Sequence, residues 1–285
     1  MFGVGLIAAI VASAMFNVGA ALQALEARKQ PKTLSLRLGL IGKLLQRPIW
    51  LLGFFLGLAG VGPQVLALAY TPFVVVQPAL VVGLLLLLVI GSRQLGESVT
   101  VVSWIGVLAI VGGVALVAAG APSHTETHRG WLPVLGVIGV LAIPSLLPFP
   151  LRGTRFDSVW LVMFASGTAF AATNVATKLM SDDAGLGHWG NAAAWAAVGL
   201  ALGFAATLTN MTAFQRAAAT VVVPVTTAVQ TFLPIVLEPL FLREHWGSSA
   251  LDGGPIGVGL VVTAVGTVLV SRTHAVSKLM AAASQ

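Results

Sequence analysis

The polar residues with the most regular spacing lie within an apolar stretch in the last third of the chain. Thr227, Gln230, Thr231, Pro234 and Glu238 recur every three or four residues, so a helix would present them as one stripe. Pro234 has no N–H, which leaves the carbonyl of Gln230 free to face a solute. Such a stripe could line a path for a polar solute. The alternative is that its side chains bond to their own or neighbouring helices as packing contacts.

Polar side chains interrupt other apolar stretches as well, and each needs a partner because unpaired polar groups are costly inside a membrane. With Thr227, Gln230, Thr231 and Glu238, the candidate solute-binding residues are Asn17, Gln64, Gln77, Pro78, Asn174 and Asn210. Hydrogen bonding between helices explains each single residue equally well. Glu238 is the carboxylate clearly inside an apolar stretch, where it could attract a cation, carry a proton or pair with Lys178.

Catalysis and metal binding receive little support from the sequence. His124 and His128 could share a helix face, but they lie in a short loop after Pro122 and lack a third ligand. Cysteine is absent, and no nucleophile–base set or glycine-rich phosphate loop stands out. We therefore predict no catalytic residue, no metal ligand and no cofactor, and we do not expect an enzyme.

Composition places the polar stripe in a membrane. Of the 285 residues, 57% are hydrophobic and 8% are charged, whereas a soluble domain has about 25% charged residues. These charges are too few for a wetted surface, so lipid must cover the outside. We predict an all-α polytopic membrane protein that forms one domain over residues 1–285. The net charge of +6 is expected to gather on the cytoplasmic side, and nucleic-acid binding is not predicted.

Uncharged stretches long enough to cross about 30 Å of hydrocarbon mark nine spans. They are Phe2–Leu22, Pro48–Tyr70, Pro72–Gly91, Val101–Gly120, Trp131–Leu147, Ser158–Thr177, Asn191–Ala213, Ala218–Phe241 and Gly254–Val270. The segment Thr33–Gln46 has leucines at helical spacing but contains Arg37 and Lys43, so we predict an amphipathic helix on the inner surface. If this segment crossed instead, the spans would number ten and the N-terminus would lie inside.

Charge predicts the orientation of the nine spans. With the N-terminus outside, twelve Lys and Arg residues fall in inner segments and three fall in outer ones, at Arg129, Lys178 and Arg243. This asymmetry follows the positive-inside rule. The prediction is a multi-pass protein of the cell membrane whose residues 273–285 form a cytoplasmic tail. No cleavable signal peptide is expected, because the first apolar stretch follows Met1 without a basic region.

Two parts of the chain resemble each other. In the first, Pro78 precedes an apolar run that ends at Gly96-Glu97; in the second, Pro224 precedes one that ends at Arg243-Glu244. Both continue into an Ile-Gly-Val opening of a further span, and in the nine-span topology the matching spans run in opposite directions. We predict an inverted repeat with halves 1–120 and 131–272, an architecture common in secondary transporters. Both glutamates lie at span ends, where they are expected to cap or anchor the turns.

These features resemble the drug/metabolite transporter superfamily, whose EamA-like repeats end in a Gly-Glu or Arg-Glu turn followed by a glycine-containing helix. Within it the chain is most similar to the NIPA-type magnesium transporters, through Gly19–Gln23, Trp50–Gly53, Leu68–Pro72, Val223-Pro224 and Arg243-Glu244. Gln77-Pro78-Ala79 departs from the Pro-Leu-Gly expected at that point. The resemblance implies nine spans with one repeat helix absent, and Mg²⁺ as the transported ion.

The predicted function is that of a secondary transporter or facilitator that moves a small solute or ion by alternating access. Mg²⁺ prefers oxygen ligands and keeps much of its water, but no carboxylate cluster is predicted at the midplane. A neutral or zwitterionic metabolite, or a lipid-linked head group, is therefore an alternative substrate. An alternative of another class is a non-transporting accessory subunit whose basic segment Arg28–Arg47 binds anionic membrane lipid or a partner. The oligomeric state is left open.

Overall fold

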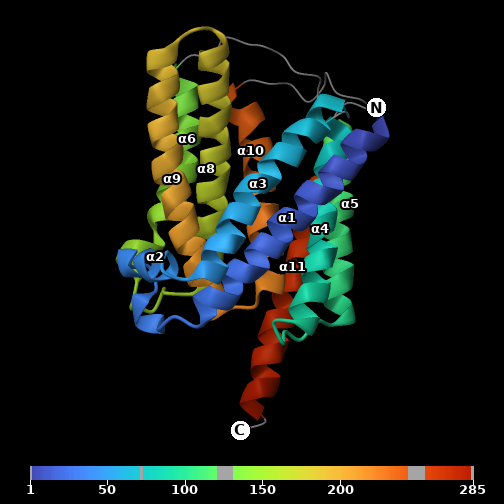
Figure 1. Cartoon of the computed structure of the whole chain (residues 1–285), viewed down its shortest axis with the longest axis vertical. Helices are drawn as coiled ribbons and strands as arrows, with labels where there is room; N and C mark the ends of the chain where they lie inside the picture. Colours follow the sequence, from blue (N-terminus) through green and yellow to red (C-terminus); the bar gives the residue numbers. More distant parts are fainter. Residues whose placement is uncertain (1, 71–72, 121–130, 243–253, 284–285) are drawn as a thin grey trace.

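The computed structural model describes residues 2–70, 73–120, 131–242 and 254–283, and within these ranges it contains helices and short connections but no strand (Figure 1). The elements are α1 (Phe2–Arg28), the 3₁₀ helix η1 (Lys32–Leu34), α2 (Leu38–Leu44), α3 (Pro48–Tyr70), α4 (Phe73–Arg93), α5 (Val101–Gly120), α6 (Trp131–Leu146), α7 (Pro148–Leu151), α8 (Val159–Gly185), α9 (Trp189–Arg216), α10 (Ala219–Leu242) and α11 (Gly254–Ala283). The all-α prediction is confirmed.

Several of these helices are long and apolar enough to cross a bilayer. In the described ranges six candidate spans occur, namely Gly3–Arg28, Pro48–Ala67, Val101–Gly120, Val134–Leu151, Val159–Thr177 and Trp189–Arg216. Shorter apolar segments lie in α4, α10 and α11, at Ala79–Arg93, Ala219–Pro234 and Gly254–Val270. This arrangement indicates a multi-pass membrane protein. The nine predicted spans coincide closely with helices, and six of these meet the length and hydropathy of a span over their described residues.

The segment between α1 and α3 does not form a span. Its helix α2 has seven residues, so at about 1.5 Å per residue it is far too short to cross the hydrocarbon core. Leu40, Ile41 and Leu44 are buried, whereas Lys43 is exposed. The predicted amphipathic helix is therefore present, and the alternative in which this segment crosses the membrane is wrong.

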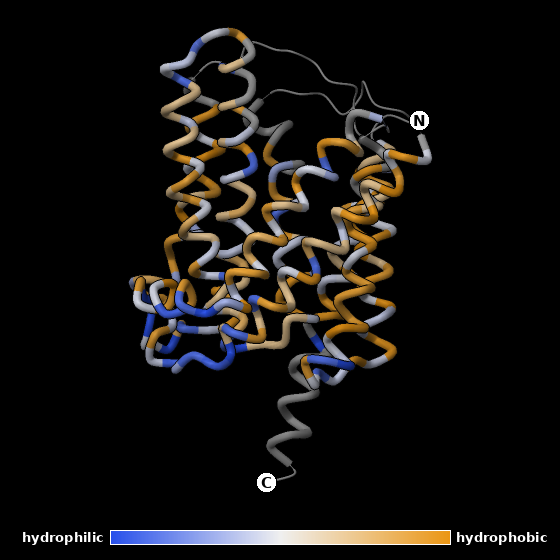
Figure 2. The backbone as a smooth tube through the Cα atoms, in the orientation of Figure 1, coloured by the Kyte–Doolittle hydropathy of each residue, from blue (hydrophilic) through white to orange (hydrophobic). Residues whose placement is uncertain are grey.

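The helices stand in two groups, with α6, α8 and α9 in one and α1, α3, α4 and α5 in the other, and α10 lies between them (Figure 1). Figure 2 shows that hydrophilic residues gather at one end of this bundle. We call it the charged end and define it by residues 28–47, 92–100, 152–158 and 216–220. The predicted tail, residues 273–285, continues α11 on this side as far as Ala283 (Figure 1).

Glycines allow α5 and α11 to pack closer than side chains would permit. A Cβ on Gly113 would lie 2.6 Å from the carbonyl oxygen of Gly259, and a Cβ on Gly106 would lie 2.9 Å from that of Gly266. The two pairs are one heptad apart on both helices, which therefore run antiparallel with their backbones in contact. Lipid offers helices no hydrophobic drive to associate, so close backbone packing of this kind holds membrane helices together.

This contact predicts opposite outcomes for two adjacent glycines. Gly113→Ala should lower stability by about 1–3 kcal/mol, because the added methyl group overpacks the α5–α11 contact. Gly112→Ala is the control, since a Cβ on Gly112 meets nothing within 4 Å and alanine favours the helix. Thermal unfolding of both variants in detergent measures the difference. Equal midpoints would show that the close packing does not stabilise the fold.

Candidate functional site: a polar layer and a charged end

Asn17 of α1 is the most enclosed of the predicted solute-binding residues whose side chains the structure describes, with 5% of its surface exposed. Its Nδ2 donates to the backbone carbonyl of Ser13 at 2.9 Å, while its Oδ1 has no hydrogen-bond partner among the described residues. A Cβ on Gly83 of α4 would collide with Asn17 Nδ2 and lie 2.8 Å from the carbonyl oxygen of Ser13. Glycine at position 83 therefore lets α4 lie directly against this buried amide.

Ser13, one turn before Asn17, ties α1 to α4. Its hydroxyl donates to the carbonyl of Leu80 and accepts the amide N–H of Gly83 at 2.9 Å. Sequence reasoning did not select Ser13. Its position on the same helix face as Asn17 is the signal that could have found it.

Several hydroxyl groups elsewhere in the bundle bond within their own helices. Thr209 donates to the carbonyl of Ala205 at 2.8 Å, and Thr226 donates to that of Val222 at 2.9 Å. Such bonds satisfy the hydroxyl without a solute, as the packing alternative requires. The stripe on α10 differs, because the side chains of Thr227, Gln230 and Thr231 are half-buried and have no hydrogen bond to any residue that the structure describes.

The remaining predicted residues fall into three kinds. Gln64 of α3 and Asn210 of α9 are half-buried, and Asn210 Oδ1 is without a partner. Asn174 of α8 is exposed. The side chains of Gln77, Pro78, Glu238 and Lys178 lie outside the described residues, as do Glu244 and the loop with His124 and His128. Solute binding by any of these residues stays a prediction.

The ends of α1 and α10 meet at one carboxylate at the charged end. Glu97 accepts hydrogen bonds from Arg28 at the end of α1 and from the amide of Ala219 at the start of α10. Asn17 and Gln230 are equally far from those ends along their helices, at about 16 Å. The two helices are in contact, and about 16 Å is close to half the thickness of a hydrocarbon core of about 30 Å.

Glu97 itself is buried, with 4% of its side chain exposed. Gly96, at a φ of 63°, forms the left-handed turn that ends α4, and the amide of Glu97 then donates to the carbonyl of Gly91 at 2.9 Å. The carboxylate accepts from the amides of Ala219 at 2.7 Å and Thr220 at 2.9 Å and from the Thr220 hydroxyl at 2.5 Å. Glu97 is thus a capping residue, as predicted, but the helix that it caps is α10.

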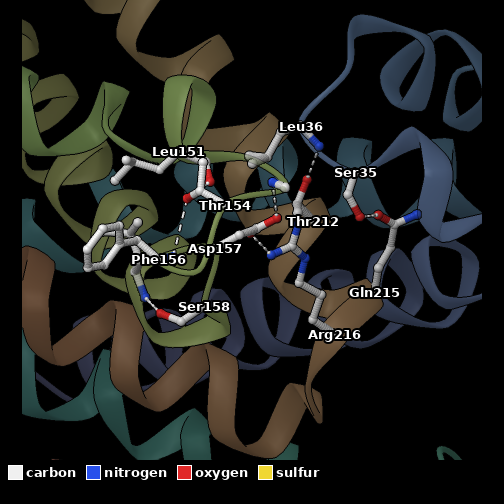
Figure 3. Close-up of polar contacts among 12 residues, drawn as sticks. Ser35, Leu36, Leu151, Thr154, Phe156, Asp157, Ser158, Thr212, Gln215 and Arg216 are labelled. Atoms are coloured by element: carbon white, nitrogen blue, oxygen red, sulfur yellow. Dashed lines mark hydrogen bonds and ion pairs between the residues drawn. The ribbon is translucent and has the colours of Figure 1, made fainter.

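A second polar network binds the connection between α1 and α2 to the end of α9 (Figure 3). Leu36 has a φ of 57°, a conformation that costs a residue with a Cβ about 1–2 kcal/mol. Its amide donates to Thr212 Oγ1 at 3.0 Å, and Ser35 donates to Gln215 at 2.9 Å. The amide of Gln215 in turn donates to the carbonyl of Gln30 at 3.3 Å. These bonds hold the strained turn, and neither Thr212 nor Gln215 was selected from the sequence.

Asp157, in the connection before α8, pairs with Arg216 at the end of α9 at 2.5 Å (Figure 3). Burial raises the pKa of this carboxyl. The hydrogen bonds from Arg216 and from the amide of Gly153, with the charges of Arg216 and Arg152, lower it by more, so the pKa of Asp157 lies below its ordinary value. A carboxyl with a depressed pKa stabilises the fold above its unfolded pKa, and this stabilisation is lost as the pH falls through the folded pKa.

We predict that Asp157→Asn destabilises the protein by about 1.5–3 kcal/mol at neutral pH, because the half-buried Arg216 loses a charged partner. The difference from wild type should shrink once the pH falls below about 4, where the wild-type carboxyl begins to gain its proton. Thermal unfolding in detergent at both pH values measures it, with Asp183→Asn as the control. Asp183 pairs with the exposed His188 at 3.4 Å. A difference that is constant with pH would contradict the assignment.

Comparison with known proteins adds one relative. An uncharacterised protein of Corynebacterium glutamicum is 26% identical to this chain over 254 residues, which cover 87% of each protein. No protein-family model and no solved structure matches the chain. The similarity extends over most of the chain and gives no biochemical activity, so the function has to be argued from the geometry.

Proposed function

We propose that the protein is a secondary transporter or facilitator that moves a small polar solute or ion across the cell membrane. The observation that carries this proposal is a set of polar side chains on the neighbouring helices α1 and α10: Asn17 Oδ1, and the side chains of Thr227, Gln230 and Thr231, have no hydrogen-bond partner among the described residues. We infer that they form one layer at mid-depth and call it the polar layer. Unpaired polar groups in a membrane interior are costly. A passing solute that supplies their missing hydrogen bonds explains why they lie there.

An inverted repeat supports the same proposal. The chain runs toward the charged end in α4 and away from it in α10, since Glu97 follows the former and caps the latter. In addition, α1 packs on α3 and α4 in the way that α8 packs on α9 and α10, and α5 packs on α11. We infer halves 1–120 and 131–272, in which α6 has no counterpart. The polar layer then lies between the halves, where secondary transporters bind their solutes.

The charged end is proposed to face the cytoplasm. The positive-inside rule favours this orientation, because Arg28, Lys43, Arg93, Arg152 and Arg216 all lie at or next to this end. The N-terminus of α1 is then outside, and the end of α11 is cytoplasmic. Membrane lipid covers the exposed apolar side chains, such as Leu200 and Val101.

The chemistry of the polar layer restricts the solute. No group of three His, Cys, Asp or Glu that could hold a metal ion occurs among the described residues. Mg²⁺, the ion that the resemblance to NIPA-type transporters implies, would therefore have to pass with much of its water, which amide and hydroxyl oxygens can accept. A neutral or zwitterionic metabolite fits an uncharged layer equally well and is the second candidate.

The first test is uptake by protein reconstituted in liposomes, measured for Mg²⁺ and for a panel of neutral and zwitterionic metabolites. We expect Asn17→Leu and Gln230→Leu to reduce uptake at least about tenfold, the factor that corresponds to loss of one hydrogen bond of about 1.4 kcal/mol. Asn191→Leu is the matched control, since Asn191 lies in the first turn of α9, away from the charged end. Unchanged uptake in both variants would overturn the site. No uptake by folded wild type would favour an accessory subunit.

A second variant separates the two kinds of solute. Asn17→Asp keeps the shape of the side chain and adds a negative charge at mid-depth. For a cation, this charge should lower the concentration at half-maximal uptake, because an opposite charge in a low dielectric attracts strongly. For a neutral metabolite, the same change should reduce uptake. Concentration series with wild type and Asn17→Asp measure the difference, and identical curves would show that Asn17 does not contact the solute.

A further inference from the structure

We propose that Glu97 controls opening of the charged end, because from the turn after α4 in the first half it caps α10 of the second half, and this cap must separate when the solute path opens there. We call Glu97, Arg28, Ala219 and Thr220 the Glu97 junction. The proposal rests on the transport function proposed above and assigns a conformational role to a group that lies outside the polar layer.

The Glu97 junction joins segments that alternating access would separate. Glu97 follows α4 and Arg28 ends α1, both in the first half, whereas Ala219 and Thr220 begin α10 in the second half. The approach is close, because a Cβ on Gly91 would collide with the methyl group of Thr220 and lie 3.1 Å from Glu97 Oε2. Movement of α10 away from α1 and α4 therefore requires Glu97 to release either Arg28 or the two amides.

The ion pairs that the structure describes at this end each lie within one half, and this includes the pair of Glu97 with Arg28. Lys29 pairs with Glu26 at 2.5 Å inside α1, and Arg216 pairs with Asp157 inside the second half. Relative movement of the halves leaves both pairs intact. Neutral hydrogen bonds, such as that of Ser35 with Gln215, also cross between the halves. The bond from Trp50 of α3 to Met211 Sδ of α9, at 3.1 Å, and that from Arg152 to the carbonyl of Thr33, at 3.0 Å, cross between the halves too. Among the described residues, Glu97 is the carboxylate that bonds to both halves.

The charge of Glu97 determines whether the two sides of the Glu97 junction attract or repel each other, and the junction can therefore act as a switch. The N-terminus of α10 carries a partial positive charge of about half a unit, and Arg28 carries a full one. The single negative charge of Glu97 lies between them. Once it is removed, Arg28 and the helix N-terminus face each other without compensation, and repulsion replaces attraction. Neutralising Glu97 should therefore favour the conformation in which the charged end is open.

The chain has no cysteine, so one introduced thiol reports on opening without a background signal. Val221→Cys is suitable, because Val221 lies in the first turn of α10 and is 4% exposed. A membrane-impermeant maleimide, applied from the side of the charged end, should label this thiol at least about tenfold faster when Glu97→Gln is added, which corresponds to a shift of about 1.4 kcal/mol. Arg28→Gln should give a smaller increase, because the carboxylate still caps α10.

Three controls separate opening from general loosening. Glu26→Gln makes the same substitution at a similarly buried carboxylate of α1 and should leave the labelling rate unchanged. Ala8→Cys, a buried position toward the opposite end of α1, should not label faster in the Glu97→Gln background. Adding Arg28→Gln to Glu97→Gln should slow the labelling of Val221→Cys again, because the repelling cation is gone; a folding defect would not be relieved in this way.

The proposal is overturned if Glu97→Gln labels at the rate of Glu26→Gln, or if Ala8→Cys and Val221→Cys accelerate together. The labelling needs no solute, so its outcome is independent of the uptake assay. Faster labelling with no uptake of any solute would retain the switch and remove the transport function. Uptake by wild type, together with a labelling rate that Glu97→Gln leaves unchanged, would retain the transport function and remove the switch.

Discussion

A buried carboxylate has to be fully satisfied, and this requirement at Glu97 orders the charged end. An uncompensated charge out of water costs several kcal/mol, so each oxygen of Glu97 needs donors. The donors come from the end of α1 and the start of α10, and Glu97 itself comes from the turn after α4. One carboxylate thus joins the ends of three helices. The proposed polar layer depends on this contact, because Asn17 and Gln230 are equally far along their helices from the joined ends of α1 and α10.

Close backbone packing holds neighbouring helices together within the bundle, as Glu97 holds helix ends together at the charged end. Gly19 of α1 and Gly53 of α3 approach so closely that a Cβ on either would lie within 2.7 Å of the other's carbonyl oxygen. Large apolar side chains such as Leu200 and Leu58 instead point outward, where lipid solvates them as well as another helix would. The stability of such a bundle therefore lies in small residues and a few polar bonds, and not in the size of its apolar side chains.

Sequence reasoning found the helices because a bilayer imposes one length on each of them. The limits of α3 and α5 coincide with the predicted spans Pro48–Tyr70 and Val101–Gly120. The contacts between helices were not predictable in the same way. Ser35 and Gln215 are far apart in sequence, and nothing in the residue type of Leu36 indicates a positive φ. Such features are set by tertiary contacts, to which a single sequence gives no direct access.

The polar residues show the same limit more sharply, since a threonine in an apolar stretch has two explanations that look identical in sequence. Thr226 and Thr227 are neighbours, yet only the first donates to a carbonyl of its own helix. The two threonine side chains face different sides of α10. This difference distinguishes a residue that serves packing from one that could line a solute path. The path so defined has amides and hydroxyls but no described carboxylate. Weak, neutral oxygen ligands hold a hydrated ion or an uncharged solute loosely, and loose binding is what allows a solute to leave the far side as readily as it entered.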